Sequence, residues 1–541
     1  MSPGESGPLP RRVQVLIAGG GPVGLAAAVE LGGRGIGCLV VEPRAAVSTA
    51  RPRCKTINVR TMEHLRRWDL ADRLRERAPL PASWSQEVVF CTSLTGHELS
   101  RFTGVLGLSP EGDRFPEIGQ QVPQYVLEEL LREAVDGLDA CELVLGSRVT
   151  AVRQGDDLVT VTVEDASGGE STVTADYVIG CDGPRSIVRE QIGASYSGGE
   201  ALRPNFGMVF RSPGLWSHVK HGPAVQYWVV NPSAPALVGP IDRDGTWWAI
   251  AFGVDREAGE RRARDIIDGL AGRPVRADVL STDPWTARMQ IADRMRDRRV
   301  FLAGDAAHLN PPFGGHGLNT GIGDAVDLGW KLAAVLNGWG GPDLLDGYET
   351  ERRPIQERII GEATSNMRVL STELLADNLD AGDEAGARAR EAAGARIQET
   401  KKAEFHSLDL ILDIHITTSP VIAFEESTAV DGDAGSPGTR LPHRFLADGG
   451  SLYDLLGPDL TLLVLDGATG KETIEDAAAA LGVPLKTVEL PWETGAGRGG
   501  ARLLLVRPDQ IVAWAGEKAP ADAAALIDKV RGVRTGSLPP L

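Results

Sequence analysis

The apolar residues of this chain fall in short runs that alternate with longer stretches of helical spacing. The first run is Val13–Ile17, and residues 38–41 and 300–303 form runs of the same kind. Such runs, aliphatic and without polar alternation, are typical of strands buried on both faces of a sheet. Leu25–Leu31, between the first two runs, is Ala-rich and has the composition of a helix. The order of strand, helix and strand predicts an α/β fold that begins with a Rossmann-like unit.

Four later regions have patterns of their own. Residues 56–77 and 124–135 have helical spacing, whereas residues 158–163 alternate as a strand does. Residues 196–287 are rich in strand patterns and predict a mostly antiparallel sheet. Two interpretations stay open for each aromatic residue of this sheet, a floor for a flat apolar ligand or plain sheet core. These residues are Phe206, Phe210, Trp216, Tyr227, Trp228, Trp247, Trp248, Phe252 and Trp285.

The last third of the chain changes character twice. The stretch from Tyr348 to about Leu412 is helical and charged, and residues 375–400 look like a solvated connecting helix. Residues 427–440 are rich in Gly, Asp and Ser, as linkers are. A separate small α/β pattern follows. Its strands are expected near residues 460–465, 487–490, 501–506 and 511–514, and its helices near 475–481 and 521–530.

The first apolar run leads directly into Gly19-Gly20-Gly21-Pro22-Val23-Gly24, which fits G-x-G-x-x-G. In this motif Gly19 allows a tight turn, Gly21 lets a pyrophosphate approach the backbone, and Gly24 lets the helix pack close to the strand. The free amides of the helix N-terminus face the phosphates. Glu42 ends the second strand, where a carboxylate accepts hydrogen bonds from a ribose hydroxyl. Together these features predict a dinucleotide site, because an ordinary glycine turn leaves the terminal acid unexplained.

Two polar residues near this unit are further candidates. Arg44 follows Glu42 closely, at a place where a cation offsets phosphate charge. The alternative for Arg44 is a solvated loop charge. Gln124 begins the predicted helix 124–135, and it points either at a cofactor or into an ordinary N-terminal turn.

Two more predicted strands end in acidic residues. The strand at 172–179 runs into Asp182-Gly183, and the carboxyl end of a strand is where open α/β sheets bind ligands. Ser186 is expected to cap the helix that follows. The strand at 300–303 runs into Gly304-Asp305, where the Asp305 carboxylate suits a ribityl or ribose hydroxyl.

A proline- and glycine-rich loop, Leu309–Asn319, follows this last motif and precedes a helix expected from about Thr320 to Leu336. The loop exposes backbone amides at a helix N-terminus, where an anionic electron-accepting ring would be stabilised. His308 and His316 are interpreted as parts of the loop structure rather than as catalysts.

Composition narrows the function further. The chain has 541 residues, 42% hydrophobic and 24% charged, which indicates a globular protein of two to four domains. A net charge of −18 argues against nucleic acid or an anionic membrane as a partner. No apolar run is long enough to span a bilayer and the N-terminus has no signal-peptide pattern, so we expect a cytoplasmic protein. The five cysteines, Cys38, Cys54, Cys91, Cys141 and Cys181, form no C-x-x-C pair, which disfavours a disulfide scaffold or a zinc ribbon.

Three motifs occur in this order: the G-x-G-x-x-G with Glu42, Asp182-Gly183, and Gly304-Asp305 with its proline- and glycine-rich loop. In this the chain resembles the class A FAD-dependent aromatic monooxygenases, the para-hydroxybenzoate hydroxylase family. The likeness covers residues 13 to about 360. It is strongest to the larger members that act on polycyclic natural products, the aromatic polyketide hydroxylases of antibiotic biosynthesis and the rebeccamycin-pathway enzyme. Those members carry a C-terminal thioredoxin-like domain, and Gly438–His443 and Ser451–Leu455 are similar to theirs.

The resemblance implies FAD as cofactor, NADPH (or NADH) as co-substrate and O2, with hydroxylation through a flavin C4a-hydroperoxide. It implies a loop flanking the isoalloxazine at Pro312, Gly314, Gly315 and Gly317. The aromatic residues of the strand-rich region and of this loop offer Tyr227, Trp228, Trp248 and Phe313 as candidates for substrate contact. No general base and no metal site can be assigned. The positions that match family cofactor contacts are Gly19, Gly21, Pro22, Gly24, Glu42, Arg44, Gln124, Asp182, Gly183, Gly304, Asp305, Pro312, Gly317, Leu318 and Asn319.

The predicted organisation follows from these motifs. Residues 1–78, 116–195 and 288–370 form a discontinuous FAD-binding domain of the GR2 type, and 79–115 with 196–287 form a substrate-binding β-sheet domain. Residues 371–426 are connecting helices, and 427–541 are a thioredoxin-like domain without redox cysteines.

The predicted function is FAD- and NAD(P)H-dependent hydroxylation of a bulky phenolic or polycyclic aromatic natural product. Baeyer–Villiger or another oxygenation at the same flavin, and a non-catalytic flavin- or ligand-binding protein, are the alternatives. The expected partner is a small aromatic substrate, and the oligomeric state stays open, with a homodimer as one option.

Overall fold

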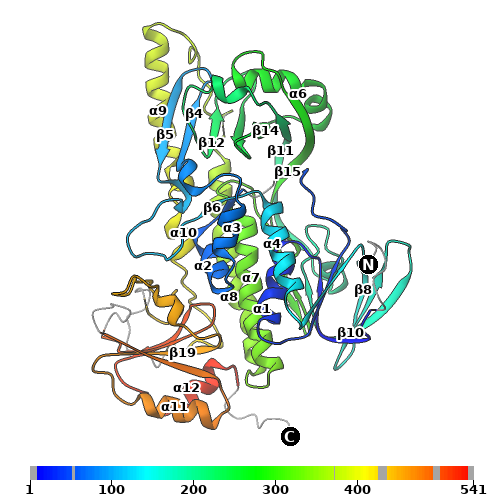
Figure 1. Cartoon of the computed structure of the whole chain (residues 1–541), viewed down its shortest axis with the longest axis vertical. Coiled ribbons are helices and arrows are strands. Elements are labelled where there is room, and N and C mark those ends of the chain that lie inside the picture. Colours follow the sequence, from blue (N-terminus) through cyan, green and yellow to red (C-terminus); the bar gives the residue numbers. More distant parts are fainter. Residues whose placement is uncertain (1–8, 51–54, 371, 425–434, 492–499, 534–541) are drawn as a thin grey trace.

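The chain folds into three units that follow one another along its longest dimension (Figure 1). The structure is a computed structural model that describes residues 9–50, 55–370, 372–424, 435–491 and 500–533, with the backbone alone at 200–202. The N-terminal tail, Cys54 and most of the predicted linker 427–440 lie outside the described residues. Over the described residues, no helix is long and apolar enough to cross a bilayer.

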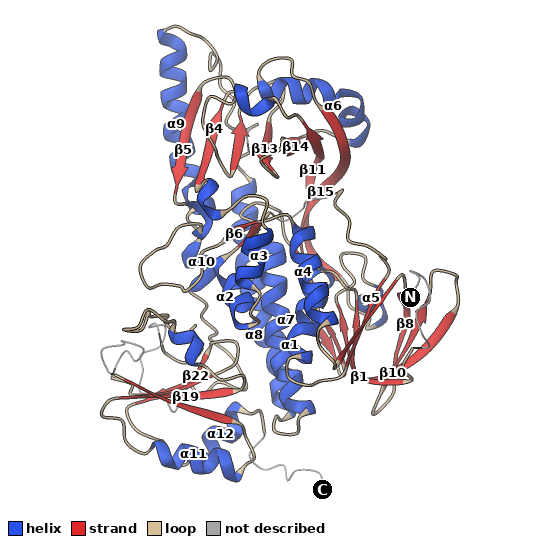
Figure 2. Ribbon diagram, viewed as in Figure 1, coloured by secondary structure: helices blue, strands red, loops and turns tan. Residues whose placement is uncertain are grey.

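The central unit is built on a mostly parallel sheet in the order β16-β17-β10-β1-β2-β7, with β9 and β8 continuing from β10. Helices α1, α4, α7 and α8 pack together beside this sheet (Figure 2). The strands are β1 (Arg12–Ala18), β2 (Cys38–Glu42), β7 (Cys141–Leu145), β8 (Arg148–Gln154), β9 (Val159–Glu164), β10 (Glu170–Gly180), β16 (Arg296–Asp297) and β17 (Val300–Leu302). The helices are α1 (Pro22–Gly32), α4 (Gln124–Asp136), α5 (Ile187–Gln191), α7 (His316–Leu336) and α8 (Pro342–Met367).

The register of this sheet brings the three motifs to one edge. β1, β10 and β17 are parallel, with Ala18 opposite Gly180 and Gly180 opposite Leu302. The loops that begin at Gly19, at Cys181 and at Ala303 therefore leave the sheet side by side. Segments far apart in the sequence thus meet at one edge, the kind of edge where open α/β sheets bind their ligands.

The predicted helix at 56–77 is divided in the structure. Thr56–Ile57 form strand β3, which pairs with β6 (Gln120–Gln121), and the helical part splits into α2 (Val59–Arg67) and α3 (Ala71–Arg77). Asn58 ends the strand and caps α2, because its side chain accepts a hydrogen bond from the Thr61 amide at 2.9 Å. Asp69 has a φ of +57° and breaks the helix between α2 and α3.

The second unit is a curved sheet in the order β18-β15-β11-β14-β13-β12-β4-β5. Helix α6 covers one face and α9 packs on β5 (Figure 1). β11 and β15 are 16 and 15 residues long and reach the central unit, where β15 pairs with β18. The elements are β4 (Glu87–Cys91), β5 (Glu98–Thr103), β11 (Tyr196–Arg211), β12 (Gln226–Val229), β13 (Ala236–Pro240), β14 (Thr246–Phe252), α6 (Arg256–Ala271), β15 (Asp278–Ala292), β18 (His308–Leu309), α9 (Glu384–Phe405) and α10 (Leu408–Leu412).

The third unit is a four-stranded sheet in the order β20-β19-β21-β22, with α11 and α12 packed against it. β19 is parallel to β20 and antiparallel to β21, the mixed arrangement expected of a thioredoxin-like domain. No cysteine occurs after residue 181, so the unit has no redox pair. The elements are β19 (Leu460–Leu465), α11 (Lys471–Ala480), β20 (Leu485–Leu490), β21 (Leu503–Val506), β22 (Val512–Gly516) and α12 (Ala523–Val530). Short 3₁₀ helices complete the chain: η1 (Ala82–Trp84), η2 (Val105–Gly107), η3 (Leu215–His218), η4 (Gly304–Ala306) and η5 (Leu452–Leu455).

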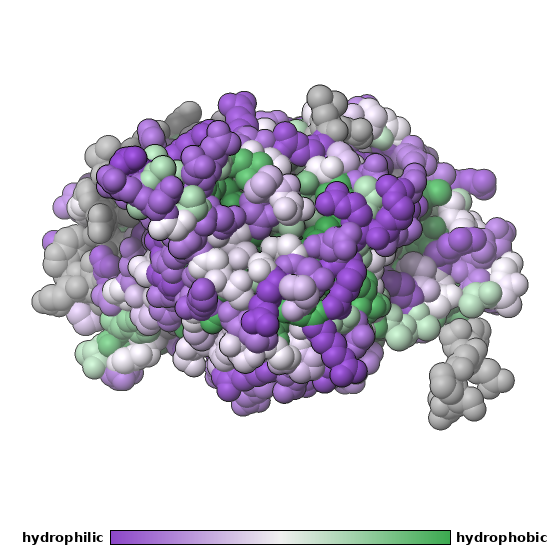
Figure 3. Space-filling model, turned by 90° about the horizontal axis from the view of Figure 1, so that it is seen from above, coloured by the Kyte–Doolittle hydropathy of each residue, from purple (hydrophilic) through white to green (hydrophobic). Residues whose placement is uncertain are grey.

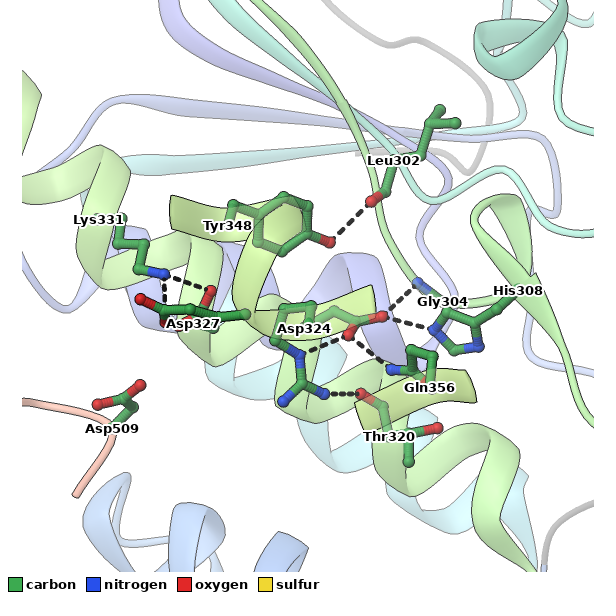
Figure 4. Close-up of polar contacts among 12 residues, drawn as sticks. Leu302, Gly304, His308, Thr320, Asp324, Asp327, Lys331, Tyr348, Gln356 and Asp509 are labelled. Carbon is green, nitrogen blue, oxygen red and sulfur yellow. Dashed lines mark hydrogen bonds and ion pairs between the residues drawn. The ribbon is translucent and has the colours of Figure 1, made fainter. Parts of the chain in front are cut away.

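Buried charges join the third unit to the central helices. Arg507, which follows β21, is fully buried and lies 3.0 Å from Asp327 and 2.8 Å from Glu351. Lys331 reaches the same two carboxylates at 2.9 and 2.8 Å. Figure 4 shows Lys331 and Asp327 on α7, with Asp509 approaching from the third unit. The charged stretch after Tyr348 is therefore partly core, and its Glu351 is an interdomain contact rather than a solvated charge.

The face of the molecule at the end of the second sheet is mainly hydrophilic. Seen from the end that carries the second sheet, purple residues surround smaller hydrophobic areas (Figure 3). Among the described residues only four large hydrophobic side chains are exposed, Leu145, Val279, Leu280 and Phe445. Scattered exposure of this kind is normal for a globular protein.

Candidate cofactor and substrate site

The glycine turn after β1 leaves room for a ligand at one position and fills the others. A Cβ on Gly19, whose φ is +103°, would overlap the Cys181 carbonyl, and a Cβ on Gly24 would overlap the Gly19 carbonyl. A Cβ on Gly21 would meet no atom within 4 Å. Gly21 is also the N-cap of α1, with Pro22 at its first position and no side chain capping the helix. The open space over Gly21 and the free amides of α1 together form a cradle for an anionic group.

Glu42 lies under this turn and is held by backbone and side-chain donors. Its Oε2 accepts from the Gly20 amide at 2.8 Å, and its Oε1 accepts from Arg44 Nε at 2.6 Å. Arg44 also donates to Glu128 Oε1 at 2.8 Å. Gln124 lies one helical turn before Glu128 on α4, so both occupy the same face, toward Arg44. Arg44 thus bridges the end of β2 and helix α4, and a cofactor contact by Arg44 or Gln124 stays a prediction.

Asp182 divides its two carboxylate oxygens between different roles. Oδ2 accepts from the amides of Ile187 and Val188 at 2.8 and 3.2 Å, which holds the start of α5. Oδ1 is buried and has no partner among the described residues. Burial raises the pKa of Asp182 above its usual value. Gly183, with a φ of +82°, has open space around its Cβ position. Ser186 caps α5 through a bond from the Arg189 amide, as expected.

Gly304-Asp305 forms the short helix η4 at the end of β17. Gly304 has a φ of +58°, and a Cβ there would lie 2.9 Å from the Val23 side chain, so this loop packs against the start of α1. The Asp305 side chain is exposed, and its carbonyl accepts a hydrogen bond from the Tyr196 hydroxyl. The Gly304-Asp305 turn thereby lies beside the start of α1.

Asp324 on α7 anchors this loop, and no motif in the sequence marks it. Its Oδ2 accepts from His308 Nε2 at 2.7 Å and from the Gly304 amide at 3.1 Å (Figure 4). Its Oδ1 accepts from Arg352 and Gln356, each at 2.8 Å. Burial alone would raise the pKa of Asp324, but His308 and Arg352 outweigh it and lower that pKa to about 2. His308 is thus structural, as interpreted from the sequence.

The proline- and glycine-rich loop closes on itself before α7. The Gly315 amide donates to the Pro312 carbonyl at 3.2 Å, and Gly314 and Gly315 both have positive φ. Helix α7 begins at His316 rather than near Thr320, and no side chain caps it. Its first-turn amides, from Gly317 and Leu318 among others, therefore point toward this edge of the sheet.

Asn319 ties the loop to the neighbouring strand. Its side-chain oxygen accepts from the Asn58 amide at 3.0 Å, and its nitrogen donates to the Thr56 carbonyl at 3.0 Å and to the Gly315 carbonyl at 2.7 Å. The side chain therefore holds the loop in place. This arrangement supports a positioning role for the Asn319 amide group.

His316 lies beneath the loop. It is almost fully buried, and burial lowers its pKa to about 4. A neutral imidazole with so low a pKa carries no charge at neutral pH, which agrees with its interpretation as part of the loop structure.

The aromatic candidates of the second sheet divide between its two faces. Phe313, in the loop, lies 6.3 Å from Trp228 and 6.1 Å from Phe252 between ring centroids. Trp248 is half-buried beside this group. Tyr227 packs on the opposite face, under α6, and its hydroxyl donates to the Gly222 carbonyl. This corrects the grouping of Tyr227 with Trp228, because neighbouring residues of a strand point to opposite faces.

Lys55 is a second residue that the sequence analysis missed. It precedes β3, and its Nζ donates to the carbonyls of Val225 and Pro240 on the second sheet. A single lysine at the end of a loop has no periodic signal, and only the fold brings it to this place.

Comparison with known proteins identifies the class to which this architecture belongs. A model of the FAD binding domain matches residues 12–363, and a model of the aromatic-ring hydroxylase C-terminal domain matches residues 434–533. The chain therefore belongs to the family of FAD-dependent aromatic-ring hydroxylases, and it is an FAD-dependent monooxygenase with NAD(P)H and O2 as co-substrates.

Individual relatives match over nearly the whole chain. The tetracenomycin B2 monooxygenase-dioxygenase of Streptomyces olivaceus is 32% identical over 96% of this chain and 98% of the relative. The structure of RebC soaked with chromopyrrolic acid, with bound 7-carboxy-K252c, is 34% identical, covers 97% of this chain and all of that one, and has a TM-score of 0.89. The ternary complex of aklavinone-11 hydroxylase with FAD and aklavinone is 28% identical, covers 96% and 98%, and has a TM-score of 0.81.

The geometry of the site fits FAD. The cradle over Gly21 has room for a pyrophosphate, and the uncapped starts of α1 and α7 supply amide donors. FAD supplies the redox and oxygen-activating chemistry when it is bound, and the protein positions it and excludes water.

Proposed function

We propose that this monooxygenase hydroxylates a bulky, flat, phenolic polycyclic compound and uses NADPH as its reductant. The observation that carries the proposal is the contact between the Phe313 ring of the proline- and glycine-rich loop and the aromatic face of the second sheet. A flat aromatic substrate between Trp248 and this loop would lie against both. The relatives named above, which act on or bind polycyclic aromatic compounds, support the same substrate class.

We also propose how the chain divides the work. The discontinuous central unit holds FAD, with Gly19, Gly21, Pro22 and Gly24 at the pyrophosphate and Glu42 at the adenosine ribose. Arg44, Gln124, Asp182, Gly183, Gly304 and Asp305 complete its contacts, and the loop from Pro312 to Asn319 flanks the ring. The second sheet holds the substrate, and the third unit supports the central helices.

The test is spectroscopic and then chemical. The purified protein is expected to show a flavin spectrum and to oxidise NADPH faster when a polycyclic phenol such as aklavinone is present. Mass spectrometry under ¹⁸O2 then locates the new oxygen. A hydroxyl on the ring supports the proposal, and insertion into a carbon–carbon bond indicates a Baeyer–Villiger reaction instead. A flavin protein that binds such compounds without consuming NADPH would be a binding protein.

A further inference from the structure

The Lys55 side chain crosses from the central unit to the second sheet. Its backbone belongs to the central unit, because the Val122 amide donates a hydrogen bond to the Lys55 carbonyl at 2.8 Å. The carbonyl of the next residue, Thr56, accepts a hydrogen bond from the Asn319 side chain. Its Nζ lies against the second sheet, where it donates to the Val225 carbonyl at 2.7 Å and to the Pro240 carbonyl at 2.9 Å. Lys55 therefore stands between the proposed flavin-flanking loop and the proposed substrate sheet.

Where the structure describes them, the surroundings of Nζ are aromatic and neutral. Nζ lies 5.2 Å from the ring centroid of Trp248. A Cβ on Gly239 would come within 2.8 Å of Trp248 Nε1, 2.9 Å of the Val225 carbonyl and 3.1 Å of Nζ, so a side chain at this position would crowd all three. The elements packed around it, β12, β13, β14 and the segment at Val122, present carbonyls and an indole. Among the described residues no carboxylate lies within ion-pair distance of Nζ. Burial lowers the pKa of Lys55 to about 7.

The valences of the nitrogen decide what Lys55 can do. A neutral amine has two N–H bonds and one lone pair, whereas an ammonium has three donors and no acceptor. The two backbone carbonyls take both N–H bonds of the neutral form and leave the lone pair as its open valence. A lone pair fixed by two hydrogen bonds, beside an aromatic wall, is placed to accept a proton from an aromatic hydroxyl.

We propose that Lys55 is a catalytic residue of this monooxygenase, the base that accepts the proton of the substrate's phenolic hydroxyl. The proposal rests on the proposed function, because it needs a phenolic substrate. The phenol O–H bond breaks, its electron pair stays on oxygen, and a third N–H bond forms at Nζ. The products are a phenolate and an ammonium in contact, and their attraction is strong in a water-excluded site.

The reaction gains from this transfer. A free phenol ionises with a pKa of about 10, so little phenolate exists at neutral pH without a base. The phenolate ring is richer in electrons and attacks an electrophilic oxygen more readily than the phenol does. A base with a pKa near the working pH is the most effective.

Three variants of the FAD-loaded protein test the proposal, with 2,4-dichlorophenol and aklavinone as probes. Lys55→Met keeps the length of the side chain without its nitrogen, and Lys55→Arg keeps a cation that cannot act as a base. Lys220→Met, which removes an exposed lysine of the second unit, is the control. Flavin occupancy and thermal unfolding are measured for each, so that a folding defect is recognised.

The expected results separate a base from a structural residue. For wild-type protein and the control, kcat/KM with the more effective phenol should rise through about pH 7 and then level off. Lys55→Met and Lys55→Arg should lower kcat/KM at pH 7 by roughly 100-fold or more. Their profiles should keep rising up to the pKa of the phenol itself, and the more acidic phenol should lose less.

Two different results would contradict the proposal. If Lys55→Met oxygenates the phenol with the wild-type pH profile, the proposal for Lys55 is overturned while the monooxygenase function stands. If the wild-type protein with bound FAD oxygenates neither probe, or only non-phenolic aromatics, both the phenolic substrate class and the role of Lys55 are overturned.

Discussion

His308 and Asp324 form a fully buried pair, with 2.7 Å between Nε2 and Oδ2, directly beneath the Gly304-Asp305 turn. The same carboxylate oxygen accepts from the Gly304 amide, so the pair fixes the backbone that presents Asp305. The shape of the proposed cofactor site is thus set by a residue that does not face it.

Asp324→Asn should destabilise the protein and loosen its flavin. The change removes the negative charge that His308 and Arg352 share, and breaking a buried pair costs roughly 3–5 kcal/mol. Urea unfolding and flavin occupancy measure the two effects. Asp346→Asn on α8, which removes a half-exposed pair with Arg296, should cost no more than about 1 kcal/mol. Equal losses in the two variants would contradict the anchoring role.

Gly21→Ala and Gly24→Ala should separate binding from folding. The Gly21 methyl meets no protein atom and the backbone there is extended, so apo stability should change by less than about 0.5 kcal/mol. FAD affinity should fall roughly 10- to 100-fold, because the methyl occupies the cradle. The Gly24 methyl overlaps the Gly19 carbonyl and should lower apo stability by about 1–3 kcal/mol. Thermal unfolding and flavin fluorescence titration are the measurements, and tight FAD binding by Gly21→Ala would refute the cradle.

Asp305→Ala should weaken FAD binding while folding is largely kept, since the side chain is exposed at a strand end. Loss of a charged hydrogen-bond partner corresponds to roughly 10- to 100-fold in affinity. Equilibrium dialysis with FAD measures it, and Asp156→Ala, in an exposed loop of the same unit, serves as control. Unchanged flavin occupancy would remove Asp305 from the site.

Trp248→Leu and Tyr227→Phe should differ in kind. Trp248 lies on the aromatic face near the loop, so its loss should raise KM for a polycyclic phenol about 2- to 10-fold. Tyr227→Phe loses the hydrogen bond to Gly222 and about 1 kcal/mol of stability, with KM unchanged. Steady-state kinetics and urea unfolding check both, and a KM effect at Tyr227 would reverse the assignment of faces.

Acid should unfold the protein between about pH 4 and pH 2. Opposing cations lower the pKa of Asp324, Glu351 and Asp509 to about 2, from ordinary values of 3.8, 4.5 and 3.8. A carboxylate whose pKa is lowered by folding stabilises above its unfolded pKa, and that stability disappears as pH falls through the folded pKa. Asp327, whose pKa burial raises to about 7, has the opposite sign, but its contribution is complete below pH 3.8. Urea midpoints that stay constant from pH 5 to pH 3 would contradict this account.

The sequence was enough to predict those elements that depend only on neighbouring residues. The strand, glycine turn and helix from Val13 to Leu31 are local, because the glycines and the apolar run act on their own neighbours. The split of residues 56–77 was missed, since Asn58 ends one element and begins another only once β6 pairs with Thr56–Ile57.

Contacts between residues far apart in the sequence could not be predicted from the hydrophobic pattern. Alternation places Tyr227 and Trp228 on opposite faces, but which face α6 covers depends on the whole sheet. Asp324 and Lys55 are single polar residues whose partners come from other elements, so neither has a sequence signature. Their roles follow from burial, which only the folded chain reveals.

Arg507 makes the central helices depend on the C-terminal unit. Its guanidinium is one of the two cations that pair with Asp327 and Glu351 inside the central helices, so the C-terminal unit supplies a counter-charge to another domain. A truncated protein would keep two buried acids with Lys331 as their one shared cation among the described residues. Exchange of the C-terminal unit between relatives should therefore succeed only when the incoming unit places an arginine at this position. The unit has no thiol chemistry, but we expect it to be kept together with the helices whose buried carboxylates it pairs.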